Sequence, residues 1–328
     1  MTLLIVLLFS SLALVAQRPV SQVEITRYLR TQYAAGIQNW AFTQDKNGRI
    51  YIANNEGLLV YNGTNWQLFP VPNKTIVRSI AFAADGKLYA GAQDEFGFYL
   101  PDKAGLLQYT SLKNLLPEKE RSFADVWDVK TDGKNVFFRT DYKIFCLADN
   151  HISIFPATSA WLPLFKHNGS VIAQDSTAGL LYFRNGSWQT LIEKNKLPAG
   201  LIVTDAVPFG HDTSLVCTRK SGLLLLTGNT LIKFPVSATV EKEQFTCLAT
   251  QEERGFLAGT YSNGIYIINR QGVATENINT ESGLQNNTVR SLFSDHNGNT
   301  WTALDNGIAF LPYSNAIRHV NPPAFNNG

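Results

Sequence analysis

The sequence has few cysteines and almost no excess of charge. Its three cysteines, Cys146, Cys217 and Cys247, are an odd number and lie far apart inside apolar runs. This spacing suits neither a disulfide framework nor a set of metal ligands, so we expect three buried thiols. Lys and Arg number 28 against 26 Asp and Glu, giving a net charge of +2. Because nucleic-acid binding needs a concentrated basic face, nucleic acid is not an expected partner.

Long apolar segments are also missing after the N-terminus. Residues 3–16 are almost entirely apolar and end in Leu-Val-Ala. As a helix this segment would rise about 21 Å, less than the roughly 30 Å of a bilayer core. Residues 1–16 are therefore predicted to be a signal peptide cleaved near Ala16, followed by an N-terminal segment at 17–36. The leader has no Lys or Arg before its apolar run, so an uncleaved N-terminal anchor is the alternative. We expect an exported protein of the periplasm or cell envelope, with no membrane span after this leader.

What the sequence does contain is an internal repeat. The clearest copies cover residues 287–313, 37–63, 76–100 and 244–268, and weaker ones lie at 123–147, 161–183 and 202–226. Each runs through an apolar strand, a turn, a second strand, a polar loop and a third apolar strand. The first turns lie 36 to 47 residues apart, at Gly48, Gly86, Gly133, Gly169, Thr213, Gly255 and Gly298. These separations centre on the roughly 40–45 residues typical of a four-stranded propeller blade.

Two further features complete the repeat. A second glycine follows the first turn by nine to eleven positions in every copy except the third, which has Tyr142-Lys143. A fourth strand is predicted at 66–71, 106–111, 152–156, 188–192, 231–236, 273–278 and 316–321. Several strands are apolar at successive positions, as a sheet packed on both faces requires.

The sequence therefore predicts an all-β fold, a seven-bladed β-propeller of four-stranded antiparallel blades over residues 37–323. A solenoid is the alternative, although solenoid coils repeat at shorter periods. How the ring closes is left open: residues 18–36, with a partly helical pattern over 24–33, either pack beside the last blade or supply a strand. Residues 324–328 are predicted to be a tail or linker.

The copy at 287–313 resembles the two-component regulator propeller repeat. The matching segments are Val289-Arg290-Ser291-Leu292, Asp295-His296-Asn297-Gly298-Asn299, Trp301 and Asn306-Gly307-Ile308. Val77-Arg78-Ser79-Ile80 with Asp85-Gly86 is a second match, and residues 281–287 are similar to the family's lead-in, with Gln285 in place of its proline.

The resemblance implies the periplasmic sensor half of a bacterial regulator. In that family fourteen blades usually form two propellers, followed by a β-sandwich, a membrane helix and a cytoplasmic output module. This sequence has seven copies and none of the later parts. The resemblance therefore implies either a fragment of a longer regulator or a propeller that acts through a partner.

A candidate site follows from the expected arrangement of the loops. If the first strand of each copy is innermost, the loops entering it share one rim with the loops between second and third strands, which include Asn55 and Asp305. Aligning the copies on their first turns gives one equivalent rim position, occupied by Trp40, Arg78, Asp125, Trp161, Asp205, Cys247 and Arg290. We predict that six of these, Trp40, Arg78, Asp125, Trp161, Asp205 and Arg290, bind a small polar ligand such as a carbohydrate. The alternative is that the position varies freely and the tryptophans pack between blades.

Catalytic signatures are not apparent. The sequence has no Gly-x-Ser-x-Gly, phosphate-binding loop or His-Glu-x-x-His motif. His167, His211 and His296 fall at the first turns of three different copies and would be spread around the opposite rim. We therefore predict a non-enzymatic sensor or ligand-binding propeller with no catalytic residue, metal or cofactor. A scaffold for a protein partner is the alternative, and a lyase or hydrolase, as in the similar fold of streptogramin lyase, is the second alternative.

Overall fold

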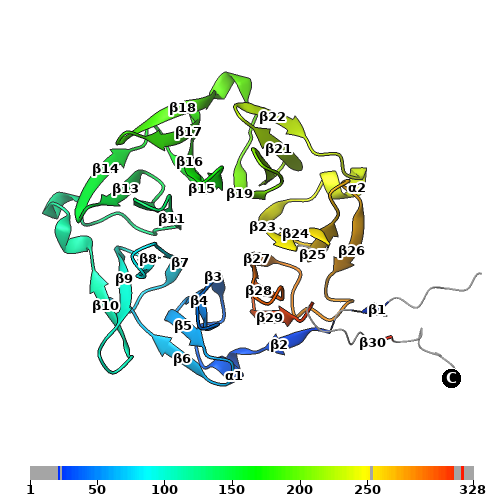
Figure 1. Cartoon of the computed structure of the whole chain (residues 1–328), viewed down its shortest axis with the longest axis horizontal. Helices are drawn as coiled ribbons and strands as arrows, with labels where there is room; N and C mark the ends of the chain where they lie inside the picture. Colours follow the sequence, from blue (N-terminus) through cyan, green and yellow to red (C-terminus); the bar gives the residue numbers. More distant parts are fainter. Residues whose placement is uncertain (1–20, 23, 252–253, 314–318, 321–328) are drawn as a thin grey trace, which may run out of the picture.

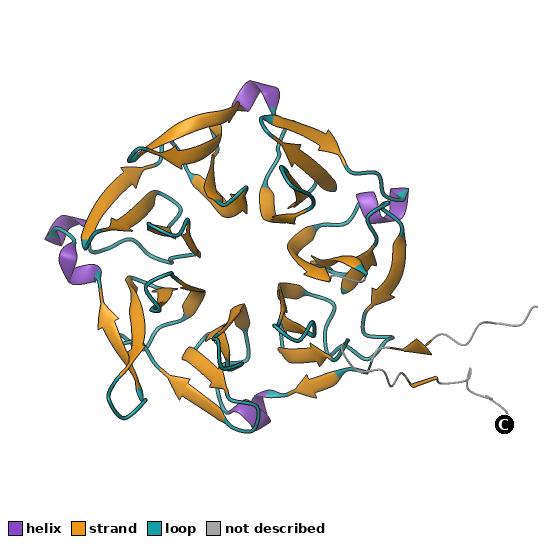
Figure 2. Cartoon of the chain, viewed as in Figure 1, coloured by secondary structure: helices purple, strands orange, loops and turns teal. Residues whose placement is uncertain are grey.

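The computed structural model describes residues 21–22, 24–251, 254–313 and 319–320. Seven four-stranded antiparallel sheets are arranged around a central channel (Figures 1 and 2). The predicted seven-bladed propeller is confirmed. The predicted signal peptide (1–16) and tail (324–328) lie outside the described residues.

Blades 1 to 6 each use four consecutive strands, ordered from the channel outward. Blade 1 contains β3 (Asn39–Gln44), β4 (Ile50–Asn54), β5 (Gly57–Tyr61) and β6 (Trp66–Phe69), and blade 2 contains β7 (Val77–Phe82), β8 (Leu88–Ala92), β9 (Glu95–Pro101) and β10 (Leu107–Ser111). Blade 3 contains β11 (Asp128–Thr131), β12 (Val136–Arg139), β13 (Lys143–Ala148) and β14 (His151–Pro156), and blade 4 contains β15 (Trp161–His167), β16 (Ser170–Asp175), β17 (Gly179–Arg184) and β18 (Ser187–Glu193). Blade 5 contains β19 (Val203–Pro208), β20 (Thr213–Thr218), β21 (Leu223–Thr227) and β22 (Thr230–Lys233), and blade 6 contains β23 (Phe245–Gln251), β24 (Gly255–Thr260), β25 (Ile265–Ile268) and β26 (Ala274–Ile278).

Blade 7 is closed by the N-terminal segment. Its inner strands are β27 (Val289–Ser294), β28 (Thr300–Leu304) and β29 (Gly307–Leu311), and its outer strand is β2 (Thr26–Tyr28). The prediction that residues 316–321 supply this strand is wrong, and of the two roles left open for residues 18–36 the structure shows that of a strand. Since β2 pairs with β29 through Thr26–Phe310 and Tyr28–Ile308, the two ends of the propeller share one sheet.

The segments beside this closure are short. Strand β1 (Ser21–Gln22) pairs with β30 (His319–Val320) in a separate two-stranded sheet. The helical pattern predicted over 24–33 holds only for α1 (Arg30–Tyr33), because the residues before it form β2. The remaining helices lie in loops between blades: η1 (Lys113–Leu115), η2 (Glu118–Glu120), η3 (Lys194–Lys196) and α2 (Ala238–Glu241).

The aspartate of the repeat signature builds the first turn. Asp295 Oδ1 accepts hydrogen bonds from the backbone N–H groups of Asn297 and Asn299, both at 2.9 Å, and its Oδ2 accepts one from Trp301 Nε1 at 3.2 Å. In blade 1, Asp45 likewise accepts from the Tyr51 hydroxyl at 3.0 Å. The signature thus ties the turn to the aromatic residue of the second strand, and its aspartate is committed to this structural role.

The second glycine is required by close backbone approach as well as by φ. At Gly264, φ is +72°, and a Cβ would lie 2.2 Å from the carbonyl oxygen of Ile278. Gly97 does not have a positive φ, yet a Cβ there would lie 2.1 Å from the carbonyl oxygen of Thr110. In these blades glycine therefore lets the end of the fourth strand lie directly against the start of the third.

The core consists of seven apolar clusters, one between each pair of neighbouring blades. The cluster between blades 7 and 1, for example, joins Trp301 and Ile308 to Ile52 and Leu59. The three cysteines are buried and unpaired, as predicted. Burial raises the pKa of Cys146 and of Cys247 to about 12, as is typical of packed thiols.

Candidate functional site

The two predicted loop sets do share one rim of the channel. Within blade 1, the backbone N–H of Asn55, in the loop after β4, donates to the carbonyl of Gln38, which enters β3. Blades 5 and 7 repeat this contact through Arg219 to Ile202 and through Asp305 to Thr288. The backbone therefore holds both loops of a blade together and brings their side chains to the same edge.

A bulge in the inner strand selects which side chain is presented there. In blades 1, 2 and 7 the antiparallel register skips Trp40, Arg78 and Arg290, leaving each without a ladder partner. A bulged residue bends the strand and re-aims its side chain. Blades 5 and 6 have the same irregularity at Thr204 and Thr246.

The bulged Arg78 lies against two indoles. Its guanidinium carbon is 4.2 Å from the ring centre of Trp40 and 4.6 Å from that of Trp127. Asp125 fixes the same group, accepting from Nε at 3.1 Å and from Nη2 at 3.5 Å. The ring centres of the two indoles are 6.4 Å apart and their planes are 70° to each other, so they contact the guanidinium from two different directions. These contacts and the pairing with Asp125 along one edge hold the guanidinium in place.

A second arginine approaches Trp40 from blade 7. The guanidinium carbon of Arg290 is 5.4 Å from the Trp40 ring centre, and its Nε and Nη2 donate to Asp305 Oδ1 at 3.0 and 2.7 Å. A chain of amides links this pair to the indole: Gln38 donates to Asp305, Asn55 donates to Gln38, and Trp40 Nε1 donates to Asn55 at 2.7 Å. We call Gln38, Trp40, Asn55, Arg78, Asp125, Trp127, Arg290 and Asp305 the rim cluster.

Four of the six predicted site residues, Trp40, Arg78, Asp125 and Arg290, belong to the rim cluster. The polar residues Asn55 and Asp305 lie on the predicted rim, whereas Trp127 was not among the predicted residues. Alignment on the first turn gives Asp125 as the blade 3 equivalent of Trp40. Trp127, two positions later and directly before β11, reaches the cluster as well as Asp125.

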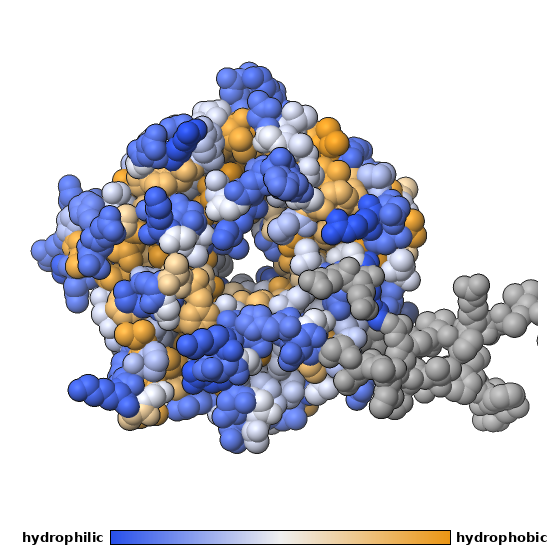
Figure 3. Space-filling model, in the orientation of Figure 1, coloured by the Kyte–Doolittle hydropathy of each residue, from blue (hydrophilic) through white to orange (hydrophobic). Residues whose placement is uncertain are grey.

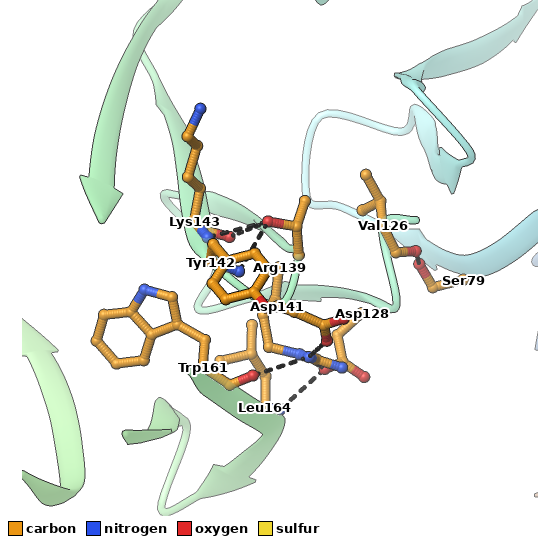
Figure 4. Close-up of polar contacts among 10 residues, drawn as sticks. Ser79, Val126, Asp128, Arg139, Asp141, Tyr142, Lys143, Trp161 and Leu164 are labelled. Carbon is orange, nitrogen blue, oxygen red and sulfur yellow. Dashed lines mark hydrogen bonds and ion pairs between the residues drawn. The ribbon is translucent and has the colours of Figure 1, made fainter. Parts of the chain in front are cut away.

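Trp161 lies instead in the core between blades 3 and 4. It is 6% exposed, packs at 5.8 Å on Trp188 and donates from Nε1 to the carbonyl of Phe155. Figure 4 shows its indole turned away from the neighbouring polar contacts, while its carbonyl accepts from Arg139. Blade packing, the alternative considered for the tryptophans, therefore describes Trp161.

Asp205 is also separate from the cluster. Its carboxylate accepts from the backbone N–H groups of Ala206 and of Leu248 in the next blade. Burial raises the pKa of this carboxyl despite those hydrogen bonds. Asp205 thus joins blades 5 and 6.

The rim is consequently uneven. Next to Asp205, the hydroxyl of Thr204 donates to the carbonyl of Phe245, and that of Thr246 donates to the carbonyl of Val289 at 2.7 Å. These bulged threonines bind back onto the next blade. The aromatic and charged side chains of the rim cluster come only from blades 7, 1, 2 and 3.

The opposite rim carries the first turns and hollows between blades. A hollow of about 470 Å³ lies between blades 1 and 2 over Tyr51, Phe82 and Tyr99, and another, of about 460 Å³, is lined by Lys130 and Lys166. His167 is buried at this end, 2.9 Å from the Ser214 hydroxyl, and burial lowers its pKa. Within the described residues, no group of His, Cys, Asp and Glu could hold a metal ion.

Comparison with known proteins identifies the fold. No family model matches the chain, and no curated protein matches its sequence. Among solved structures, the extracellular domain of BT4673 from B. thetaiotaomicron superposes with a TM-score of 0.70 at 18% identity. The chain is similar to it over 89% of its own length and 40% of that domain. That domain is described as part of a one-component system in one crystal structure and of a hybrid two-component system in another.

Other propellers superpose nearly as well. The WD40 propeller domain of Doa1 has a TM-score of 0.67 at 8% identity, over 89% of this chain and 96% of that one. Virginiamycin B lyase from Staphylococcus aureus has a TM-score of 0.64 at 13% identity, over 88% and 98%. Such identities establish the seven-bladed fold, which proteins of different function share. The chain spans about two fifths of the BT4673 domain. No helix in the described parts of the chain is long and apolar enough to cross a membrane.

Proposed function

We propose that this chain is an extracytoplasmic sensor propeller that binds a small polar ligand at the rim cluster. The observation that carries the proposal is the contact of Arg78 with both Trp40 and Trp127, held by Asp125 at the mouth of the channel. Figure 3 shows one face of the ring hollowed at its centre, with both hydrophilic and hydrophobic residues around the opening.

The arrangement favours binding for a physical reason. The two indoles and the Arg78 guanidinium are partly buried, and their hydrogen bonds and mutual contacts fix them before a ligand arrives. A fixed side chain loses little conformational entropy on binding. Four neighbouring blades contribute to the cluster, so a ligand there would contact blades that are distant in sequence.

The sensor role is supported by two independent likenesses. The repeat at 287–313 resembles that of two-component regulators, and the BT4673 propeller is an extracellular domain of such a system. The apolar leader at 1–16 agrees with export. In a regulator the propeller would pass occupancy of the rim to an output module in the same or a partner chain.

Binding can be tested through the tryptophans of the site. Purified protein is titrated with neutral and acidic saccharides and other small polar compounds, followed by tryptophan fluorescence and calorimetry. We expect a ligand whose affinity falls at least about tenfold, or 1.4 kcal/mol, in Trp40→Ala and Trp127→Ala. Circular dichroism would confirm that both variants fold.

The matched control is Arg219→Ala, an exposed rim residue of blade 5, outside the cluster. It should leave the affinity unchanged. A ligand bound equally well by Trp40→Ala and Trp127→Ala would place binding elsewhere and overturn the proposal. A captured protein partner, with no compound bound, would instead favour the scaffold function.

A further inference from the structure

The two arginines of the rim cluster each have hydrogen-bond donors that the protein does not use. Arg78 engages Asp125 through Nε and Nη2, and Arg290 engages Asp305 through the same two atoms. Among the described residues, none accepts a hydrogen bond from Nη1 of either arginine. A guanidinium has five N–H donors, so each retains a donating edge after pairing with its carboxylate.

Both arginines lie beside the same indole, that of Trp40. Both guanidinium carbons lie near the Trp40 ring centre, at 4.2 and 5.4 Å, and are therefore within about 10 Å of each other. The side chain of Arg78 is only 13% exposed and that of Arg290 28%. Ionic hydrogen bonds are screened less by salt in such partly buried places than on an open surface.

The rings of Trp40 and Trp127 also limit which ligands fit the site. Arg78 lies over the rings of Trp40 and Trp127, so its guanidinium occupies indole surface on which a neutral sugar ring would stack. What the cluster offers instead is a pair of oriented guanidinium edges. Such planar forks match the geometry of a carboxylate or sulfate.

We propose that the Nη1 groups of Arg78 and Arg290 bind an oxyanion, either a carboxylate or a sulfate, of the rim ligand. This inference rests on the proposed function and specifies the chemistry of its ligand. Asp125 and Asp305 act as positioning residues: each holds one edge of its guanidinium, and the ligand takes the other. Their negative charges offset the positive charges of the two arginines. The site would therefore select an oxyanion by its geometry as well as by its charge.

The test uses the anions themselves. The protein is titrated with sodium malonate and sodium sulfate, against sodium chloride at the same ionic strength, while tryptophan fluorescence is recorded. We expect a saturable change with malonate, sulfate or both that chloride does not reproduce. The malonate and sulfate titrations show which oxyanion is preferred.

Variants separate a specific site from general charge. Arg290→Gln should weaken oxyanion binding at least tenfold, and Arg290→Lys, which keeps the charge but lacks the fork, should weaken it nearly as much. Arg78→Lys provides a second test that retains the positive charge. Arg219→Gln, on the blade 5 rim, should bind as the native protein does.

Two results would overturn the inference: an equal response to chloride, or binding that Arg290→Gln and Arg78→Lys leave intact. Its failure is distinguishable from that of the proposed function. A neutral compound whose binding depends on Trp40, with no response to malonate or sulfate, would leave a ligand-binding rim and exclude the oxyanion. If no compound of either class bound, both proposals would fail.

Discussion

Some polar side chains on the rim stabilise their own loops and do not belong to the rim cluster. Asp175 ends β16 on the rim. Its Oδ1 accepts from the N–H groups of Thr177 and Ala178, both at 2.8 Å, and from the Thr177 hydroxyl at 2.7 Å. Burial alone would raise the pKa of this carboxyl, but these hydrogen bonds and one from Thr158 lower it overall.

The lowered pKa of Asp175 predicts a pH-dependent contribution to stability. Because the folded state binds the proton more weakly than the unfolded state, the contribution is complete above the ordinary pKa of 3.8 and is lost as pH falls through the folded value. Asp175→Asn should lower the free energy of unfolding by about 1–2 kcal/mol at pH 7, and the difference should shrink below about pH 4. Urea denaturation at several pH values measures it.

The control for this experiment is Asp149→Asn in the exposed turn after β13. Asp149 makes no hydrogen bond through its carboxylate to any described residue, so little change is expected at either pH. A difference between Asp175→Asn and the native protein that stayed constant from pH 7 to pH 3 would contradict the electrostatic explanation.

The sequence predicted the correct rim, but not every predicted residue lies in the rim cluster. Counting back from the first turn works where the inner strand has the same bulge, as at Trp40, Arg78 and Arg290. In blade 4 the register instead skips two residues, Pro163 and Leu164, and Trp161 pairs regularly with Asp175. A bulge depends on pairing with the next strand, so turn spacing alone could not locate it.

At the scale of elements, six of the seven outer strands were predictable because each follows its own third strand through a short turn. Strand β2 was not, because it is three residues long and pairs with β29, far away in the sequence. Aromatic contacts of Tyr28 attach this strand to the ring. Tyr28 stacks on Trp301 at 5.8 Å and meets Trp66 edge to face at 5.2 Å, so it joins blade 7 to blade 1.

We predict that Tyr28→Ala weakens the closure of the ring. Removing a half-buried aromatic ring that contacts two blades should lower the free energy of unfolding by about 2–3 kcal/mol. Arg27→Ala, on the exposed side of the same strand, is the matched control and should change it by less than about 0.5 kcal/mol. Equal effects of the two variants in urea denaturation would show that β2 is not held by Tyr28.

For the molecule as a whole, the closed ring determines how stability is shared. Each blade buries both faces against its neighbours, through seven clusters that return to the starting blade. An open repeat array can lose an end repeat while exposing only one interface. A ring with no end must expose two interfaces when any blade unfolds, which favours cooperative unfolding.

The closed ring therefore predicts a single unfolding transition. Substitutions at distant blade interfaces should all shift this same transition. Phe137→Leu, in the fully buried cluster between blades 3 and 4, should lower the midpoint of that transition by an amount equivalent to about 1 kcal/mol. Tyr28→Ala, at the interface between blades 7 and 1, should shift the same transition. Circular dichroism and tryptophan fluorescence should coincide in both variants. A second transition in either variant would show instead that blades unfold separately despite the closure.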